Sequence, residues 1–263
     1  MNKIGLVIPT VLSRPKLLPL VYESCLDQGD FLEILVGCPE HMIPAVQAAL
    51  PAGAKVVAEK EGISLAGKIS ELMLSTSEDC KYIGWIGDDD IILPGAMQAC
   101  LDVMESEPDV TLAYGACDYI DESGSILFTN KSGQWASALL RFGPQLIPQP
   151  GSVMRRTAFQ EAGGLDPRFN MAFDFDIFLK LGQLGKLRYV PKTLAQFRWH
   201  PGSLSVRRRG AAVLEASLAR RQNYRYPMSV IWPLWEPIVV FATWFAGKLV
   251  SLRYVKLRSQ PTD

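Results

Sequence analysis

The chain has 263 residues, 48% of them hydrophobic, and its 27 basic and 27 acidic side chains cancel to a formal net charge of zero. A chain of this length and composition can bury a sizeable hydrophobic core. It is neither too short nor too polar to be globular, so we expect a globular protein. The five cysteines are odd in number and none stands in a Cys-x-x-Cys pair, so we expect reduced, buried thiols. Because the first apolar stretch is short and ends at Pro9, we expect no signal peptide and a cytoplasmic location.

The first hundred residues alternate short apolar runs with stretches of helical periodicity. The short runs predict strands over residues 4–8, 33–36 and 55–57, and a further strand at 82–87. The periodic stretches predict helices over residues 16–25, 43–50 and 65–74. The residues expected on the buried side of the last helix are Leu65, Ile69, Leu72 and Met73. This alternation predicts an α/β fold with a doubly wound, largely parallel sheet.

The sequence after this alternation predicts a small antiparallel addition. Residues 110–117 and 126–128 are strand-like, and the turn sequence Asp121-Glu122-Ser123-Gly124 separates them. In a doubly wound sheet the ligand crevice lies at the carboxyl ends of the parallel strands. The residues expected at that edge are Pro9, Thr10, Gly37, Cys38 and Asp88–Asp90.

Three consecutive aspartates, Asp88, Asp89 and Asp90, follow the apolar run at 82–87. Adjacent carboxylates repel one another and are costly to dehydrate, so this run favours a site that holds a cation. Alternate residues of an extended segment share a face, so Asp88 and Asp90 could hold one ion. Carboxylate oxygens select Mg²⁺ or Mn²⁺, which keep positions open for phosphate oxygens. The alternative is a solvated acidic turn that caps a helix starting near Pro94.

A second acidic position, Asp174, stands where apolar helical periodicity begins. The pattern continues to Gly185, which we expect to be the glycine just past the helix end. Asp174 could cap this helix, and a capping role does not exclude a catalytic one.

Further on, Arg198 and His200 lie in one short cluster. An arginine side chain suits phosphate, whereas a lone histidine is more often structural.

The charge is distributed unevenly: from residue 177 to the end there are 15 basic and 3 acidic side chains, which leaves 12 basic and 24 acidic ones before it. Within this basic part, residues 231–252 are apolar and rich in tryptophan, with arginines and lysines on both sides. Such flanks are typical of a membrane interface. Because Glu236, Lys248 and two prolines interrupt the stretch, an interfacial or re-entrant helix is favoured over a true span or a soluble or dimerising helix.

Several short motifs follow one another in a characteristic order. They are Ile8-Pro9-Thr10, Gly87-Asp88-Asp89-Asp90, Tyr119-Ile120-Asp121-Glu122-Ser123-Gly124, Gln149-Pro150-Gly151 with Arg155-Arg156, Gly163-Gly164-Leu165-Asp166, Asp174-Phe175-Asp176-Ile177 and Arg198-Trp199-His200-Pro201-Gly202-Ser203. In this order they resemble the family 2 glycosyltransferases of the GT-A fold, bacterial in type, over roughly residues 3–206. The expected organisation is a GT-A domain over 1–206 and a membrane-associating helical tail over 207–263.

The resemblance implies an inverting, metal-dependent transfer of a sugar from a nucleotide-sugar donor to a hydroxyl acceptor. Asp174 corresponds to the family's general base. Asp88 and Asp90, with His200 as a further ligand, correspond to its Mn²⁺ or Mg²⁺ residues. The residues expected to contact the donor are Pro9, Thr10, Arg14, Gly37, Lys68, Asp88, Asp89 and Arg198. A membrane-facing tail would bring this site to a lipid-linked or cell-surface polysaccharide acceptor.

Two positions depart from the family pattern. Relatives commonly carry an acidic pair after the second strand, where this chain has Val36-Gly37-Cys38-Pro39, so uridine recognition does not follow from the resemblance. The base is often preceded by glutamate, and here Phe173 stands before Asp174. A hydrophobic neighbour could raise the pKa of Asp174 and suit it to proton abstraction.

Other functions remain open. A nucleotidyltransferase would use a similar sheet but needs a glycine-rich loop after the first strand, and the stretch from Pro9 to Arg14 contains no glycine. A catalytically silent, membrane-bound sugar-nucleotide-binding protein is the other alternative. Nucleic acid is not an expected partner, because Arg207–Arg209 come without an aromatic platform.

Overall fold

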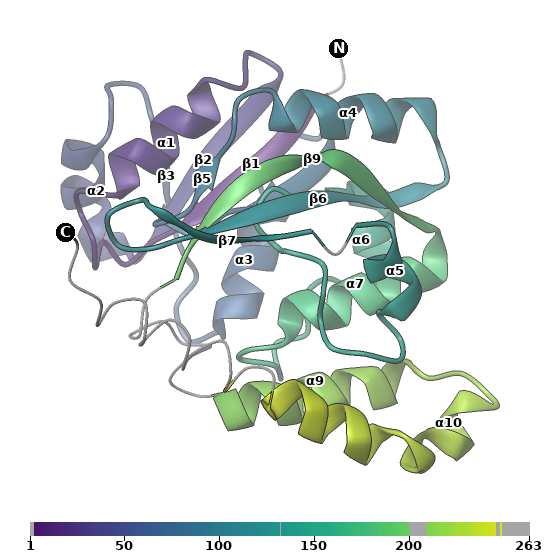
Figure 1. Cartoon of the computed structure of the whole chain (residues 1–263). Helices are drawn as coiled ribbons and strands as arrows, with labels where there is room; N and C mark the ends of the chain where they lie inside the picture. The colour runs from purple at the N-terminus through teal and green to yellow at the C-terminus, as the bar shows by residue number, and fades with distance from the viewer. Residues whose placement is uncertain (1–2, 132, 200–208, 246–247, 249–263) are drawn as a thin grey trace, which may run out of the picture.

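The computed structural model describes residues 3–131, 133–199, 209–245 and 248, and it begins with the predicted alternation of strands and helices (Figure 1). The bounds are close to those expected from hydrophobic periodicity, and the helix predicted over 65–74 is observed over those residues. The elements of this first part are β1 (Lys3–Pro9), α1 (Leu18–Leu26), β2 (Leu32–Cys38), the 3-10 turn η1 (Glu40–Met42), α2 (Ile43–Ala49), β3 (Lys55–Ala58), α3 (Leu65–Leu74) and β4 (Cys80–Trp85).

The second part of the chain extends the sheet and ends in helices. Its elements are β5 (Ile91–Ile92), α4 (Ala96–Ser106), β6 (Val110–Ile120), β7 (Ile126–Asn130), α5 (Trp135–Leu139), β8 (Val153–Arg155), α6 (Arg156–Glu161), α7 (Phe173–Leu184), β9 (Lys186–Arg198), α9 (Arg209–Asn223), α10 (Met228–Ile231) and η2 (Trp232–Leu234). A further helix, Glu236–Phe245, follows η2.

In the described part of the chain, nine strands form one sheet in the order β3-β2-β1-β4-β8-β6-β9-β5, with β7 added beside β6. The pairs β3-β2, β2-β1, β1-β4 and β6-β9 are parallel, whereas β8, β5 and β7 run antiparallel to their neighbours. The largely parallel sheet and the antiparallel β6–β7 hairpin are therefore confirmed. The sequence prediction did not include β8 and β9, which complete the sheet between β4 and β5.

Helices cover both faces of the sheet and form two cores. On one face, Ile4, Leu6 and Ile8 of β1 pack with buried residues of α1, α2 and α4. On the other face, Val7 of β1 packs with buried residues of α3, α6 and α7. Successive side chains of a strand point to opposite faces, so β1, which is apolar from Ile4 onwards, supplies both cores. All five cysteines are buried and free, as the sequence predicted.

One local expectation was wrong, and another was right in position but not in backbone conformation: Gly185 directly follows α7, as predicted. Leu65 is 47% exposed, and Ala66 takes its place on the buried side of α3 with Ile69, Leu72 and Met73. Gly185 has an extended backbone rather than the left-handed conformation of a terminal glycine. It is instead required by close packing, because a Cβ there would lie 2.4 Å from the carbonyl oxygen of Asp109.

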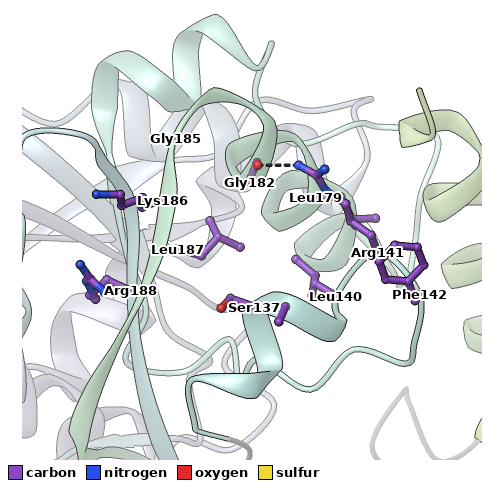
Figure 2. A pocket seen from close by; sticks show the side chains of 11 residues that line it. Ser137, Leu140, Arg141, Phe142, Leu179, Gly182, Gly185, Lys186, Leu187 and Arg188 are labelled. Carbon is purple, nitrogen blue, oxygen red and sulfur yellow. Dashed lines mark hydrogen bonds between the residues drawn. The ribbon is translucent and has the colours of Figure 1, made fainter. Parts of the chain in front are cut away.

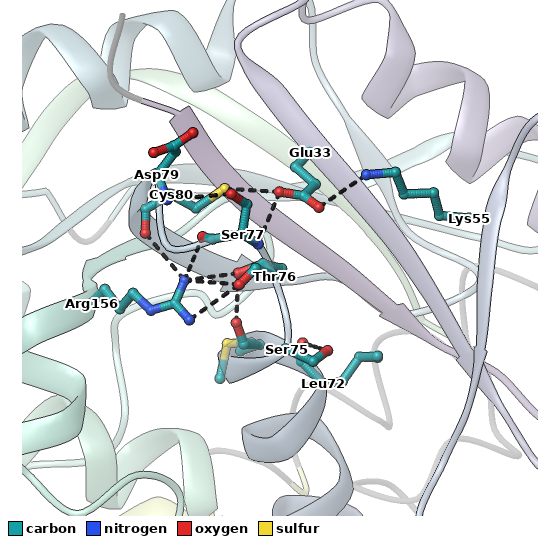
Figure 3. Close-up of polar contacts among 10 residues, drawn as sticks. Glu33, Lys55, Leu72, Ser75, Thr76, Ser77, Asp79, Cys80 and Arg156 are labelled. Atoms are coloured by element: carbon teal, nitrogen blue, oxygen red, sulfur yellow. Dashed lines mark hydrogen bonds and ion pairs between the residues drawn. The ribbon is translucent and has the colours of Figure 1, made fainter.

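The two arginines after the Gln149-Pro150-Gly151 motif are structural. The Arg156 guanidinium donates to the carbonyl oxygens of Thr76 and Ser77 at 3.2 and 2.8 Å, where α3 ends before β4 (Figure 3). It also donates to the carbonyl oxygen of Leu74 at 2.7 Å. Arg155 donates to carbonyl oxygens of Met104 and Val110. These bonds satisfy carbonyl groups that a helix end or loop leaves without partners.

The C-terminal helices lie against α7, as Figure 1 shows. Ala219 of α9 belongs to the core that contains α7. The boundary predicted at 206/207 falls outside the described residues, so the division into two domains stays a prediction. Among the described residues, no single helix is long and apolar enough to cross a membrane. The helical segments 228–234 and 236–245 reach the necessary length and apolar character only when they are taken together, and the pair is bent by 58° at the break between them.

Candidate active site

The carboxyl ends of β1 and β2 meet as predicted. Pro9 is in register with Gly37, and the amide of Thr10 donates to the Gly37 carbonyl at 2.8 Å. A Cβ on Gly37 would lie 2.5 Å from a methyl carbon of Leu72 on α3, so glycine is needed for close packing at this edge. The structure brings these positions together, and their contact with a donor stays a prediction.

The loop after β1 is fixed against the first two aspartates. The Thr10 hydroxyl donates to Asp88 Oδ2 at 2.5 Å, and Arg14 forms an ion pair with Asp89. The amide of Leu12, whose φ is +50°, donates back to the Thr10 hydroxyl at 2.8 Å. The structure therefore places Thr10 beside the acidic run, as the sequence predicted, and adds Arg14 there; contact of either residue with a donor stays a prediction.

Asp90 is the most deeply buried of the three aspartates, at 3% exposure. Its Oδ1 accepts a hydrogen bond of 2.9 Å from the amide of Arg198. Burial, and to a lesser degree the charge of Asp88, raises the pKa of Asp90 to about 7, against the lowering effect of the Arg198 amide. Asp90 is not a helix cap, because α4 begins after Gly95 with no side-chain cap. The alternative of an acidic capping turn is therefore wrong.

Arg198 is inside the protein, at 7% exposure. Its Nε donates to the carbonyl of Asp89 at 3.0 Å, and its Nη1 donates to the carbonyls of Asp121 and Glu122 at 2.9 and 3.2 Å. The guanidinium thus ties the acidic loop to the β6–β7 turn, instead of pointing freely into the crevice as a phosphate contact would. His200, the further metal ligand expected from the sequence, lies outside the described residues.

The residues around Asp88 and Asp90 fit a hard divalent cation in part. The Asp88 carboxylate is close enough to Asp90 to raise its pKa, which is the repulsion that a cation relieves. Within the described ranges, however, no group of three His, Cys, Asp or Glu side chains is arranged to hold a metal. A metal held by these two carboxylates would therefore share its remaining positions with water or a ligand's oxygens.

Lys68 has a partner that the sequence did not predict. Its Nζ lies 3.0 Å from Glu59 Oε2, and the Glu59 side chain is only 4% exposed. The amide of Glu59 donates to the carbonyl of Cys38 at 2.8 Å, so Glu59 lies at the same edge as Gly37. An acidic residue is thus present beside the end of β2, although β3 supplies it. The adjacency of parallel strand ends was the signal that could have identified it.

Asp174 is the second residue of α7 and is held at both carboxylate oxygens. Gln145 Nε2 donates to Oδ2 at 2.6 Å, and the amide of Phe175 donates to Oδ1 at 2.8 Å. Burial raises the pKa of Asp174, although these hydrogen bonds oppose the shift. Asp174 is not the N-cap of α7: that position is Ala172, which has no side-chain cap, and Asp174 lies inside the first turn. Glu215 of α9 accepts from the amides of residues 170–172, just before the helix. Gln145 and Glu215 were missed because their partners are distant in sequence.

Asp174 and the triple aspartate face a common region. Phe173 contacts Trp85, the last residue of β4, with ring centroids 6.1 Å apart. Burial raises the pKa of Tyr119, and the nearby charges of Asp90 and Asp174 raise it further. A half-buried carboxyl with a raised pKa near an acidic strand end suits general-base chemistry.

A cavity of about 450 Å³ lies at the other end of α7 (Figure 2). Its walls include Leu140, Leu187 and Arg141, and Arg141 donates to the carbonyl of Gly182 at 2.8 Å. The other two basic side chains that line the cavity form ion pairs: Lys186 pairs with Asp109, and Arg188 pairs with Glu107. None of the predicted site residues lines this cavity.

The fold and the strand-end site define a class: an α/β domain of the GT-A type. The Staphylococcus aureus protein TarS, in its crystal structure over residues 1–349 with UDP, superposes with a TM-score of 0.56 at 12% identity, covering 84% of this chain and 65% of that one. A second crystal structure of TarS over residues 1–349 superposes with a TM-score of 0.56 at 10% identity, covering 93% of this chain and 80% of that one. This likeness shows the fold.

The sequence comparisons point to the same class, although no family model matches. The uncharacterized protein y4gI of Sinorhizobium fredii is 28% identical over 174 residues, which are 62% of this chain and 19% of that protein. Chondroitin synthase of Escherichia coli is 22% identical over 127 residues, which are 48% of this chain and 18% of that protein. Hyaluronan synthase of Pasteurella multocida is 22% identical over 130 residues, which are 49% and 13%.

The chain therefore spans less than a fifth of the length of these curated relatives. Together with the ordered motifs and the fold, the similarities support a GT-A-like glycosyltransferase of family 2.

Arg198→Met should destabilise the protein, because it leaves the carbonyls of Asp89, Asp121 and Glu122 without their buried donor. We expect the free energy of unfolding to fall by about 1–3 kcal/mol, measured by urea unfolding. Arg188→Met, which removes an exposed pair with Glu107, is the control and should change it by less than about 1 kcal/mol. An Arg198 variant of unchanged stability but weakened nucleotide binding would instead make Arg198 a ligand contact.

Proposed function

We propose that this protein is an inverting glycosyltransferase that moves a sugar from a nucleotide-sugar donor to a hydroxyl group of a growing polysaccharide or its lipid-linked precursor. The observation that carries the proposal is Asp174, a half-buried carboxyl whose pKa is raised and whose two oxygens each accept a hydrogen bond, near the triple-aspartate edge. The UDP bound to TarS and the polysaccharide products named for the synthase relatives support the donor and acceptor classes.

The proposed reaction uses Asp174 as the base. As the acceptor hydroxyl attacks the anomeric carbon, its proton passes to the Asp174 carboxylate and a bond from the acceptor oxygen to that carbon forms. The bond between the carbon and the phosphate oxygen breaks with its electron pair, so the nucleoside diphosphate leaves from the opposite face and the configuration inverts. Because Oδ1 and Oδ2 are both held, the base keeps one orientation during the attack.

The proposed donor site is the strand-end edge of Thr10, Arg14, Lys68 and the aspartates. Arg14 and Lys68 supply positive charge near the departing diphosphate, and their pairing with Asp89 and Glu59 fixes where that charge lies. Bound Mn²⁺ or Mg²⁺ at Asp88 and Asp90 would offset the negative charge that develops on the leaving group. Glu59 is positioned to stand in for the acidic residues that relatives carry after the second strand.

A panel of UDP-, GDP- and dTDP-sugars tests the proposal directly. Isothermal titration with and without Mn²⁺ would identify the donor, and release of nucleoside diphosphate would separate an enzyme from a silent sugar-nucleotide-binding protein. Absence of binding and turnover across the panel would contradict the proposed function.

We further propose that the C-terminal helices attach the protein to the cytoplasmic face of a membrane as a peripheral protein. Leu234, Ile238 and Phe241 are 77%, 69% and 66% exposed, so the bent helix pair presents an apolar surface. Arg221 lies over the Trp232 ring at 4.5 Å, which adds a cation at its border. Exposed apolar side chains with bordering cations suit an interface with anionic lipid.

Asp174→Asn should lower kcat by about 10²–10⁴-fold with donor affinity nearly unchanged, because the amide keeps the shape but cannot accept the proton. The parent enzyme needs Asp174 in its ionised form. Because the pKa of Asp174 is raised, activity should fall on acidification already at a pH above the ordinary pKa of an aspartate. Initial rates from pH 4 to 8 would show this acid limb. A folded Asn variant that turns over like the parent would remove Asp174 from the mechanism.

Asp88→Ala and Asp90→Ala should each weaken Mn²⁺-dependent donor binding, because the unneutralised diphosphate would meet the remaining carboxylates. Chelation of the parent protein should have the same effect in titration calorimetry. Asp109→Ala, which removes an exposed carboxylate at the other edge of the sheet, is the control. If donor affinity is the same with and without chelator, the cation proposal is wrong.

Replacing Leu234, Ile238 and Phe241 by Ser should reduce co-sedimentation with vesicles containing phosphatidylglycerol, and high salt should weaken the parent's binding because surface charges are screened. The matched control replaces Leu20, Leu26 and Leu74, which are exposed apolar residues of α1 and α3, by Ser. Equal vesicle binding by the parent and both variants would contradict a membrane surface here. Truncation after Ser229 is a poor test, because it removes Glu236, the buried partner of Arg220.

A further inference from the structure

An ion pair is buried between the C-terminal helices and the rest of the protein. Arg220 of α9 and Glu236 of the last described helix are 1% and 3% exposed in their side chains, and Arg220 Nη2 lies 2.6 Å from Glu236 Oε1. Arg220 Nε and the Tyr224 hydroxyl donate to the same carboxylate at 3.1 Å. Although burial raises the pKa of Glu236, these donors lower it by more, so the carboxylate stays charged.

Glu236 therefore has a different role from the one suggested by the sequence, where it interrupts an apolar stretch. The neighbouring Trp235 packs between Phe142 and Tyr224, with ring centroids 6.3 and 5.9 Å away. Residues 235 and 236 face the protein, whereas Leu234 and Ile238 face outwards. One helix pair thus has an anchored inner face and an apolar outer face.

Arg220 also contacts two segments of the candidate active site. Its Nη1 donates to the carbonyl of Gly143 at 2.8 Å, and its guanidinium carbon lies 5.6 Å from the centroid of the Phe175 ring. Gly143 comes two residues before Gln145, whose side chain holds Asp174 Oδ2. The amide of Phe175 holds Asp174 Oδ1. The guanidinium therefore touches both segments that hold the carboxylate.

The rest of α9 braces the same end of α7. Glu215 accepts from the amides of Asn170, Met171 and Ala172 at 2.9, 2.7 and 3.2 Å, just before the helix begins. Asn223 donates to Asp176 Oδ1 at 2.9 Å. Figure 1 shows α9 lying along α7, with α10 beyond it. These contacts make α9 the connection between the C-terminal helices and Asp174.

We propose that the Arg220–Glu236 pair is a positioning element that couples the placement of the C-terminal apolar helices to the orientation of Asp174, through the Gly143–Gln145 segment and Phe175. This proposal rests on the proposed role of Asp174 as the base. Its consequence is that seating of the apolar face on a membrane and alignment of the base are linked, so catalysis is favoured where the acceptor is lipid-linked.

The choice of an ion pair supports a positioning role. A buried pair is often no more stabilising than apolar residues of similar volume, because removing two charges from water is costly. A guanidinium offers five donors in a fixed plane, so one side chain can hold Glu236 and Gly143 at once while stacking on Phe175. Apolar residues would fill the space without fixing these directions.

The experiment compares Glu236→Gln with Glu107→Gln, which neutralises the exposed Arg188–Glu107 pair, in the full-length protein. For Glu236→Gln we expect kcat to fall by roughly 10- to 100-fold with KM for the donor within about twofold, because the base is misplaced while the donor edge is untouched. The hydrogen bond from Gln145 lowers the pKa of Asp174, so its loss would raise that pKa. The fall of the reaction rate on acidification should then begin at a higher pH. Glu107→Gln should change neither quantity.

A second variant separates positioning from stability. The double change Arg220→Met with Glu236→Leu removes both charges together, so the protein should keep its Tm but lose kcat as Glu236→Gln does. Anionic vesicles should stimulate the parent and leave the double variant unstimulated. Parent-like kcat and vesicle response in either variant would overturn the proposal.

Hydrogen–deuterium exchange provides a readout that does not need turnover. Amides of residues 143–149 and 173–176 should exchange faster in Glu236→Gln, whereas those of β1 and β2 should be unchanged. If these amides respond but the parent transfers no sugar, the coupling holds and the proposed function fails. If the parent is active and the amides do not respond, the coupling fails and the function stands.

Discussion

The repulsion among the carboxylates gathered at one edge of the sheet is the constraint on which the rest of the site depends. Asp88, Asp89 and Asp90 follow the end of β4 after two intervening residues, and each has a partner from another part of the chain: the Thr10 hydroxyl, Arg14 and the amide of Arg198. These partners come from the ends of β1 and β9, so the acidic edge can form only when the complete sheet has assembled. The long β9 strand is thus part of the site as well as of the fold.

The site has a second half that a different element positions. Helix α7 carries Asp174 in its first turn, and the amides before that turn are bound by Glu215 of α9 rather than by a local cap. Orphan amides at a helix start must find an acceptor, and a distant carboxylate does this while also fixing α9. The C-terminal helices are consequently bound to α7, the helix that carries Asp174, and Arg220 with Glu236 continues that connection outwards.

Much of the fold and part of the site could be predicted from the sequence. The helix Leu65–Leu74, the β6–β7 hairpin and the position of the triple aspartate follow from local periodicity and turn residues. Gln145 and Glu236 could not be assigned, because their partners Asp174 and Arg220 lie 29 and 16 residues away in the chain. Glu59 is only nine residues from its partner Lys68, and the adjacency of the parallel strand ends could have identified it. For the same reason Arg198, which resembles a phosphate contact in sequence, is a brace for three carbonyls in the structure.

By itself, the sequence determined the strands of the first part of the chain and the β6–β7 hairpin, the place of the acidic run after its strand and the start of a helix at Asp174, since hydrophobic period and turn chemistry are local properties. Only the tertiary structure decided which charges are paired and which are buried. The pKa of Asp90 at about 7 and the raised pKa of Asp174 arise from desolvation by residues of several elements. Desolvation depends on everything that surrounds a group in space, and no window of sequence contains that information.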